Sequence, residues 1–264
     1  MDKKIVFFDI DGTLVDNETH EIPESTKEAI QIMRKRGHIA VINTGRTWGN
    51  VDKKIRDIGF DGYICGCGTY VFYHGQWLLK SSLPHTLCIE TVENFRKWNI
   101  PAFYEGFDGM YFDTEAGWID DNIRLIKKTI GERAKEIPKE VSEIDLNFDK
   151  FCLYFVSQSD KEKAMEWMEQ YFCCIKREHG MMEIVPKGYS KATGIEYIRK
   201  QLQIPIENCY AIGDSMNDLP MLQAVPNSIV MGEAPEELVK ICMFQTKKVM
   251  EDGIFFALRQ YGLI

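Results

Sequence analysis

Two carboxylates stand two positions apart near the start of this chain, in the sequence Asp-Ile-Asp-Gly-Thr at positions 9–13. They follow residues 4–8, a short and mostly apolar run that predicts a buried strand. Because open α/β sheets bind ligands at the carboxyl ends of their strands, Asp9 and Asp11 are expected to project into a ligand crevice. Two acids this close repel each other. Their spacing therefore predicts a divalent cation that both acids bind together with other ligands.

A second predicted strand, at residues 38–42, also ends in polar residues. Thr44, Gly45 and Arg46 follow it closely, and far downstream Lys191 begins a predicted helix. A threonine hydroxyl and the backbone amides after it can grip a phosphate oxygen at such a strand end. This spacing therefore indicates recognition of a phosphate group beside the two acids.

A third strand end carries acids as well. The sequence Gly-Asp-Ser-Met-Asn-Asp at 213–218 follows the strand predicted at 210–212. If the segment after Asp214 is helical, its spacing of four from Asp218 puts both carboxylates on one helix face. Asp9 and Asp214, at the ends of two different strands, are suited to hold one cation.

Taken in order, the four segments around Asp9, Thr44, Lys191 and Asp214 resemble the four signature motifs of the haloacid dehalogenase superfamily of phosphatases. The long segment between the second and third motifs resembles the large inserted α/β cap of the Cof-type branch, type IIB. The closing Asp-Gly-Ile at 252–254, with its helix-like tail, resembles that branch too. The resemblance spans essentially the whole chain.

The resemblance implies that the acids have different roles. Asp9 would attack phosphorus and form an aspartyl-phosphate, and Asp11 would protonate the leaving alcohol and then activate water. Asp9, Asp214 and the backbone carbonyl of Asp11 would hold Mg²⁺, with Asp218 supporting that shell. Mg²⁺ suits oxygen ligands and phosphate, and it would neutralise the repulsion between the nucleophile and its substrate.

The resemblance also implies which residues hold the phosphate. Thr44, Gly45 with its neighbouring amides, and Lys191 would bind the transferring phosphoryl group and spread its charge. Asn217 would orient Lys191 or the phosphate. One position departs from the Cof-type pattern, because Cys67 stands where relatives commonly carry Asn before a glycine. A weakly polar thiol replaces an amide that could face the substrate, so the identity of the leaving group does not follow from the resemblance.

The order of the predicted elements indicates an α/β fold with an insertion. Strands and helices alternate in residues 1–81 and again in 184–264, which predicts a Rossmann-like, doubly wound parallel-sheet core in two separate stretches. Residues 82–183 mix hairpins with helices, which predicts an inserted α+β cap domain, and the resemblance assigns substrate specificity to it. The helix after the first motif begins with a capping box at Ser25. The other predicted strands are 62–65, 151–156, 182–185 and 228–231; the hairpins are 71–79 and 102–112; the helices are 25–37, 48–58, 86–98, 161–171 and 190–197.

The composition excludes several classes of protein. A net charge of −8 over 264 residues argues against a broad nucleic-acid or anionic-membrane surface, because such binding depends on many Lys and Arg side chains. No apolar run approaches the length of a membrane span, and the acids at positions 9 and 11 interrupt the apolar stretch that a signal peptide requires. We therefore expect a cytoplasmic protein with no nucleic-acid, membrane or obligate protein partner.

The eight cysteines could suggest a metal site or disulfides. Cys65 and Cys67, and the neighbours Cys173 and Cys174, do not show the paired spacing of a structural zinc site. The five histidines are scattered, and none pairs at the spacing of a metal-binding helix. Reduced, buried or half-buried thiols are the expected state.

Together these features predict a Mg²⁺-dependent phosphatase that hydrolyses a small phosphorylated metabolite, with sugar phosphates as the favoured class. A phosphomutase of the same superfamily is the first alternative, because it shares the aspartyl-phosphate and passes the phosphoryl group to a second sugar hydroxyl. A phospho-aspartate signalling module is the second; the inserted cap and the separate Asp11 count against it. In the cap, Phe103, Tyr104, Tyr111 and Trp118 are candidate leaving-group contacts, although most apolar aromatics in such a segment form its core.

Overall fold

The computed structural model describes residues 2–113, 121–177 and 180–264. The chain divides into two compact units. The first consists of Met1–Arg46, Val51–Lys80 and Tyr189–Ile264, and the second of Thr47–Asn50 and Ser81–Gly188. Within the described ranges, no helix is both long and apolar enough to cross a membrane.

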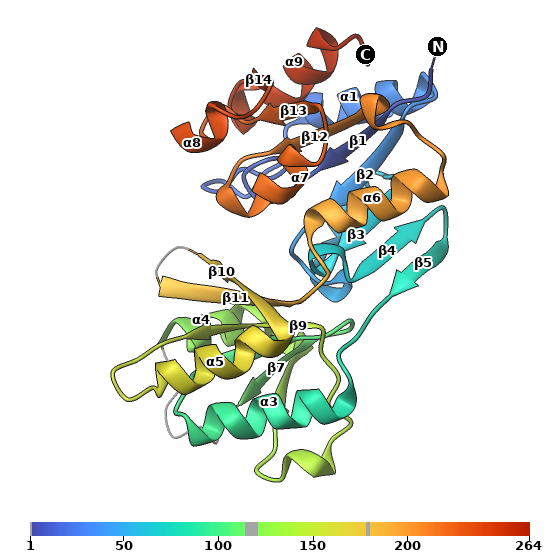
Figure 1. The fold of residues 1–264 in the computed structure, drawn as a ribbon. Helices are drawn as coiled ribbons and strands as arrows, with labels where there is room; N and C mark the ends of the chain where they lie inside the picture. Colours follow the sequence, from blue (N-terminus) through green and yellow to red (C-terminus); the bar gives the residue numbers. More distant parts are fainter. Residues whose placement is uncertain (1, 114–120, 178–179) are drawn as a thin grey trace. The chain divides into compact units, whose positions relative to one another are not determined.

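The first unit is built on an eight-stranded sheet (Figure 1). From edge to edge its strands are β14 (Phe244–Gln245), β13 (Asn227–Val230), β12 (Cys209–Gly213), β1 (Ile5–Phe8), β2 (Ile39–Asn43), β3 (Gly62–Cys65), β4 (Tyr70–Tyr73) and β5 (Gln76–Lys80). The strands from β14 to β3 are parallel, and β4 and β5 add an antiparallel hairpin at one edge. The carboxyl ends of the parallel strands therefore share one edge of the sheet.

Helices cover both faces of this sheet, as Figure 1 shows. On one face, side chains of α6 (Lys191–Gln201), α7 (Leu219–Gln223) and α8 (Glu236–Val239) share a buried cluster with Phe7 and Val41. Side chains alternate along a strand, so the buried Val6 and Phe8 project to the other face. That face carries α1 (Glu24–Lys35) and α9 (Gly253–Gln260), which pack against each other. The unit is a doubly wound α/β sheet.

The second unit contains a six-stranded sheet. Its strands are, in order, β10 (Phe172–Lys176), β11 (Met181–Pro186), β9 (Lys150–Tyr154), β6 (Ala102–Glu105), β7 (Met110–Asp113) and β8 (Ala134–Ile137). Neighbouring strands are antiparallel except for β7 and β8, which are parallel. The helices α3 (His85–Lys97) and α5 (Lys161–Tyr171) pack on one face, and α4 (Asp121–Ile130) packs on the other.

Three of the four aromatic residues proposed as leaving-group contacts lie in the packed interior of this unit. Tyr104 and Tyr111 belong to the buried cluster that includes side chains of α3 and α5. Phe103 is buried on the opposite face of the sheet with Ile123 of α4. Trp118 lies outside the described residues. Phe103, Tyr104 and Tyr111 are thus core residues, which is the role that most aromatics in such a segment have.

The fold class predicted from the sequence is confirmed. The strand predicted at 62–65 and the helix predicted at 161–171 match β3 and α5 residue for residue, and both predicted hairpins form. His74 and Gly75 make the turn of the β4–β5 hairpin, with φ of +44° and +82°. Positive φ at both central residues is the geometry that suits the twist of a two-residue hairpin.

Two predictions of helix boundaries are wrong. The helix predicted at 48–58 is divided into a 3₁₀ turn, η1 (Trp48–Asn50), and α2 (Lys53–Arg56), because Asp52 between them has extended backbone with φ −61° and ψ 148°. The capping box predicted at Ser25 is also wrong. The helix begins one residue earlier, and the Ser25 hydroxyl donates to Asp252 Oδ1 at 2.5 Å.

Three short strands were not predicted from the sequence. They are β8, β10 and β14, each at the edge of its sheet. No loop separates β10 from the helix before it, since Tyr171 ends α5 and Phe172 begins the strand. A strand that starts directly at the end of a helix offers none of the turn residues that normally mark such a change.

Candidate active site

The parallel register brings three polar strand ends to one edge of the first unit. Phe8, the last residue of β1, pairs with residues at the carboxyl ends of both β12 and β2. Asp9, Thr44 and Asp214 therefore leave the sheet at the same edge. The Asp9 amide still donates to the carbonyl of Ile212 at 3.0 Å, which fixes the backbone of Asp9 to β12.

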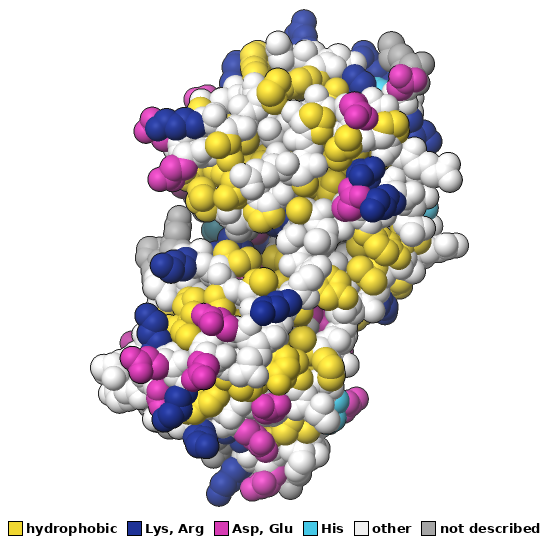
Figure 2. All heavy atoms as spheres, in the orientation of Figure 1, with side chains coloured by type: hydrophobic (Ala, Val, Ile, Leu, Met, Phe, Trp, Pro, Cys, Tyr) yellow, Lys and Arg dark blue, Asp and Glu magenta, His cyan; other side chains and the backbone are white. Residues whose placement is uncertain are grey.

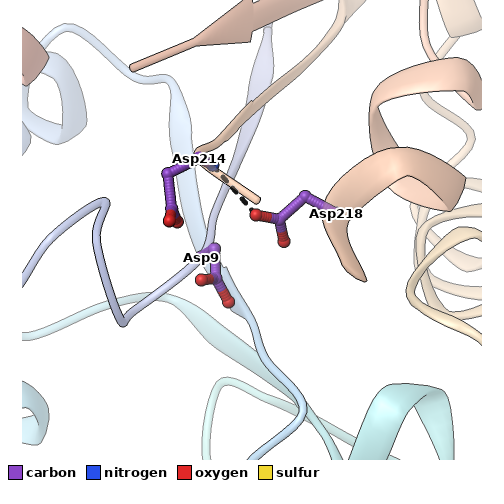
Figure 3. A group of neighbouring side chains, drawn as sticks. All are labelled: Asp9, Asp214 and Asp218. Atoms are coloured by element: carbon purple, nitrogen blue, oxygen red, sulfur yellow. Dashed lines mark hydrogen bonds between the residues drawn. The ribbon is translucent and has the colours of Figure 1, made fainter. Parts of the chain in front are cut away.

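Three carboxylates converge there, from Asp9, Asp214 and Asp218 (Figure 3). Each can offer one oxygen such that these oxygens all lie within 4.8 Å of one another. Burial, and then the charge of Asp218, raise the pKa of Asp9 to about 7. Burial and the charges of Asp218 and Asp9 raise the pKa of Asp214 to about 8. Buried acids that repel one another in this way gain from a divalent cation, so the donor set fits Mg²⁺.

Gly12 lets the turn after β1 pass close to Asp214. Its φ is +77°, and a Cβ at this position would lie 2.2 Å from Asp214 Oδ2. The next residue, Thr13, donates its hydroxyl to Asp214 Oδ1 at 3.0 Å. No local sequence pattern predicts this role of Thr13, because its partner is 201 positions away.

Asp218 has both carboxylate oxygens engaged by protein groups. Its Oδ2 accepts from the amides of Asp214 and Ser215, at 2.9 and 3.1 Å, and its Oδ1 accepts from Lys191 Nζ at 2.5 Å. The prediction that Asp214 and Asp218 share a helix face is wrong, because Asp214 precedes the 3₁₀ turn η7 (Met216–Asp218). A tight capping turn brings the two acids together instead.

Lys191 is the buried cation of this edge. Ser190 caps α6, so Lys191 is the first residue of the helix. Its ammonium group donates to Asp9 Oδ1 at 2.6 Å and to Asp218 Oδ1 at 2.5 Å, and its side chain is 1% exposed. Burial alone would lower the pKa of Lys191, but Asp218 and Asp9 outweigh burial and raise it. Asn43 Nδ2 donates to the Lys191 carbonyl at 3.0 Å and so ties this helix start to β2.

Thr44 and Gly45 follow β2 directly, and both are buried. The Thr44 hydroxyl accepts from the Arg46 amide at 3.1 Å. A hydroxyl that accepts one hydrogen bond still has its own hydrogen to donate. Cys67 donates its amide to the Thr44 carbonyl at 3.1 Å, and its φ of +55° shows that the chain turns left-handed there.

The second acid of the first motif, Asp11, is directed to Arg46. Arg46 Nε donates to Asp11 Oδ2 at 2.9 Å and Arg46 Nη2 to Asp11 Oδ1 at 2.5 Å, while Nη1 donates to Asp52 at 3.0 Å. The Asp11 side chain is 53% exposed. Arg46 belongs to the second motif, but no local pattern predicts its pairing with Asp11, which lies 35 positions away.

Asn217 lies within the capping turn between Asp214 and Asp218. Its amide oxygen accepts from the Ser215 hydroxyl. The hydrogen bonds described above direct Lys191 to Asp9 and Asp218, so the structure places Asn217 with Ser215. The contact between Asn217 and Lys191 that the resemblance implies stays a prediction.

A parallel sheet with three acids and a buried lysine at its strand ends has the arrangement of an α/β enzyme whose active site lies at that edge. The chain belongs to the haloacid dehalogenase-like hydrolase family, whose model matches residues 6–258. The family resemblance inferred from the four motifs is thereby confirmed.

Two of the similar proteins, from different bacteria, are named phosphatases. A protein of Bacillus subtilis (strain 168) named "Putative phosphatase YkrA" is 30% identical over 264 residues, which covers 100% of both chains. The HMP-PP phosphatase of Yersinia pseudotuberculosis serotype I (strain IP32953) is 29% identical over 246 residues, covering 89% of this chain and 86% of that one. The chain is accordingly a phosphatase of this family.

Solved structures agree with this assignment. A hypothetical protein from Geobacillus kaustophilus HTA426 superposes with a TM-score of 0.85 at 29% identity, covering 100% of both chains. A sugar phosphatase of haloacid dehalogenase subclass IIB superposes with a TM-score of 0.82 at 25% identity, covering 99% of this chain and 100% of that one. The second structure belongs to the subclass that the inserted segment resembles.

Proposed function

We propose that this chain is a Mg²⁺-dependent phosphatase that hydrolyses a small phosphate monoester, a sugar phosphate above all, through an aspartyl-phosphate on Asp9. The observation that carries the proposal is the position of Lys191. Its ammonium group holds one oxygen of Asp9 and one of Asp218, directly beside the carboxylate of Asp214. A nucleophilic carboxylate, a fixed cation and two further acids are the parts that phosphoryl transfer requires.

The metal would be held by Asp9, Asp214 and the backbone carbonyl of Asp11. When bound, Mg²⁺ would neutralise the charge of the phosphate and of its nucleophile, so that the two anions can approach. Asp218 supports these ligands indirectly, because its Oδ2 accepts from the amides of the turn that carries Asp214. Raised pKa values at Asp9 and Asp214 support this assignment, since they show that the two negative charges lack sufficient compensation from the protein alone.

In this proposal the hydrogen bonds of Asp9 decide which of its oxygens attacks. Lys191 Nζ occupies Oδ1 at 2.6 Å, so Oδ2 is the oxygen directed at phosphorus. Lys191 stays protonated. Its positive charge stabilises the negative charge that shifts among the phosphoryl oxygens during transfer. The Thr44 hydroxyl and the amides around Gly45 bind the remaining phosphoryl oxygens.

Asp11 handles protons in both halves of the reaction. It gives a proton to the leaving alcohol when Asp9 attacks, and it takes a proton from water when the aspartyl-phosphate is hydrolysed. One group can do both, because donation leaves it ionised and ready to accept. Arg46, which holds both oxygens of Asp11, is placed to control this group.

The second unit recognises the leaving group and excludes bulk water from the reaction. Names of relatives support a small phosphorylated metabolite, since they include an HMP-PP phosphatase and a subclass IIB sugar phosphatase. On the face drawn in Figure 2, acidic and basic side chains are interspersed on both units, which supports a small substrate over an extended polyanion. A cytoplasmic location fits the eight free cysteines.

A panel of phosphate esters tests the proposal. The purified protein should release inorganic phosphate with Mg²⁺ and lose this activity in excess chelator. Asp9→Asn should abolish release, whereas the matched control Asp16→Asn, an acid in the exposed turn that follows, should retain it. Transfer of phosphate between sugar hydroxyls without release would indicate a phosphomutase instead.

A further inference from the structure

The first turn of α6 decides where the ammonium group of Lys191 lies. Lys191 is the first residue of this helix, and its Nζ donates to Asp9 at 2.6 Å and to Asp218 at 2.5 Å. A displacement of the helix start by about 1 Å would lengthen both bonds beyond the normal range. Because the side chain is buried, it has little room to compensate. The contacts that hold the helix start against the sheet therefore affect the site.

Two glycines allow the start of α6 to approach its neighbours closely. A Cβ on Gly194 would lie 2.4 Å from Ile64 Cγ2 on β3, and a Cβ on Gly68 would lie 2.4 Å from the carbonyl oxygen of Ser190. The Cγ2 methyl group is bonded directly to Cβ and cannot swing far aside. The helix backbone thus lies against β3 and against the 3₁₀ turn η2 (Gly66–Gly68), with no space for a side chain between them.

Asn43 adds a polar contact to this apolar layer. It is fully buried near the end of β2, and its Nδ2 donates to the Lys191 carbonyl at 3.0 Å. Side chains at alternate positions of a strand share a face, and Ile39 and Val41 on this face belong to the buried apolar cluster. An apolar side chain would therefore be expected at position 43.

The amide of Asn43 is only partly satisfied. Among the residues that the structure describes, no group donates to its buried Oδ1. The Lys191 carbonyl does not require the bond from Nδ2, because a carbonyl in the first turn of a helix accepts from the amide four residues later. A buried acceptor without a donor costs folding free energy. A residue that breaks a packing rule in this way is expected at a functional site.

We propose that Asn43 and Gly194 are positioning residues for phosphoryl transfer, which hold the start of α6 at the depth where Lys191 reaches both carboxylates. Asn43 fixes the backbone of the same residue whose ammonium group acts, and Gly194 leaves the space that this depth requires. Neither residue needs to touch the substrate. The inference rests on the proposed function, because it takes Lys191 as the cation that stabilises the transferring phosphoryl group.

The first test compares two asparagines of the first unit. Asn227 also donates through Nδ2 to backbone carbonyls, those of Glu207 and Cys209, at 2.8 and 3.0 Å. It begins β13, at the opposite edge of the sheet from the carboxylates. Asn227→Leu should lower the melting temperature by about 2–4 °C, because it leaves these carbonyls without their donor, and should keep the wild-type kcat.

Asn43→Leu should show the reverse behaviour. Its kcat should fall about tenfold on p-nitrophenyl phosphate and on a sugar phosphate alike, because a displaced Lys191 affects every ester. KM should stay within about twofold, since the lost interaction is one made in the transition state. Its melting temperature should fall by less than about 1 °C, because leucine has a similar size and no unpaired acceptor.

Two results would overturn the role of Asn43. One is a wild-type kcat in Asn43→Leu. The other is a loss of melting temperature as large as that of Asn227→Leu, which would show that Asn43 serves the fold. The proposed function fails separately, if the wild-type protein releases phosphate from no ester with Mg²⁺.

A double-mutant cycle tests the contact beneath Gly194, and it decides the matter even if Asn43→Leu does not fold. Gly194→Ala should lower kcat about tenfold, because the new Cβ meets Ile64 Cγ2 and lifts the helix start. Ile64→Ala removes that methyl group, so in its background Gly194→Ala should change kcat by less than about twofold. If Gly194→Ala costs the same in both backgrounds, the depth of α6 does not position Lys191 and the inference is wrong.

Discussion

Lys191 Nζ lies 2.6 Å from Asp9 Oδ1, although 182 positions separate the two residues in the sequence. The contact is possible because β1 and the start of α6 meet at one edge of the sheet, where Asn43 anchors the Lys191 backbone. It places a permanent positive charge against the proposed nucleophile. Lys191 therefore supplies the positive charge that Asp9 and Asp218 share.

Replacement of Lys191 should cost both activity and stability. Lys191→Ala leaves the buried carboxylates of Asp9 and Asp218 without their cation, so the free energy of unfolding should fall by about 3 kcal/mol. Turnover should fall on all substrates alike, because the lost interaction acts on the transferring phosphoryl group. Lys200→Ala, an exposed lysine of the same helix, is the control and should change neither quantity. A strong change in substrate ranking by Lys191→Ala would contradict this role.

Gly12 and Gly37 form a matched pair of glycines. Both have positive φ, +77° and +87°, but a Cβ on Gly12 would lie 2.2 Å from Asp214 Oδ2, whereas a Cβ on Gly37 meets nothing within 4 Å. Gly37→Ala should therefore cost only the backbone strain, about 1 kcal/mol of unfolding free energy, and keep full activity. Gly12→Ala should cost more than this and should weaken Mg²⁺ binding, as titration calorimetry can measure. Equal effects of the two substitutions would show that the approach of Gly12 to Asp214 is unimportant.

The stabilisation of the protein by Mg²⁺ should depend on pH. The pKa values of Asp9 and Asp214 are raised to about 7 and about 8 in the folded, metal-free protein. Carboxyl groups with raised pKa values stabilise the fold while protonated, so metal-free protein should lose stability as the pH rises through these values. Mg²⁺ binds the ionised groups, so the gain in melting temperature from saturating Mg²⁺ should increase between pH 6 and 8. A gain that is constant or decreases with pH would argue against Asp9 and Asp214 as ligands.

The second unit contains a buried ion network that should matter for stability. Lys150 lies between Glu105 and Glu183, and Arg177 also pairs with Glu183. Burial would raise the pKa of Glu183, but Lys150 and Arg177 outweigh it and lower this pKa to about 2. Because a lowered pKa stabilises the fold only above the unfolded value of 4.5, this contribution should vanish as the pH falls from there toward 2.

The variant Glu183→Gln tests this network. It leaves the buried Lys150 and the half-buried Arg177 with less compensation, so it should lower the free energy of unfolding at pH 7 by about 3 kcal/mol. The deficit should shrink when unfolding is measured at progressively lower pH below 4.5, because Glu183 of the unfolded wild-type protein becomes protonated there, and Glu183 of the folded protein follows near pH 2. A deficit that is independent of pH would mean that Glu183 acts through packing and not through its charge.

The strand ends of the site could be predicted from the sequence, and the links between them could not. Asp9 stands directly after a short apolar run and Thr44 two positions after another, and a parallel sheet collects the ends of such runs at one edge. The paired oxygens of Asp11 and the arginine that holds them are 35 positions apart, and no local pattern records such a contact. Asp214 and Asp218 do meet, but a capping turn brings them together and not the helix that their spacing suggested.

The most direct test of the central claim is the intact mass of the protein after mixing with p-nitrophenyl phosphate and Mg²⁺. We predict that Asp11→Asn gains the mass of one phosphoryl group and retains it, because the activated ester needs no acid while the loss of the base slows hydrolysis by about 10² to 10⁴-fold. Asp9→Asn should gain nothing. A phosphorylated Asp9→Asn protein would contradict the assignment of Asp9 as the nucleophile and, with it, the mechanism proposed for this site.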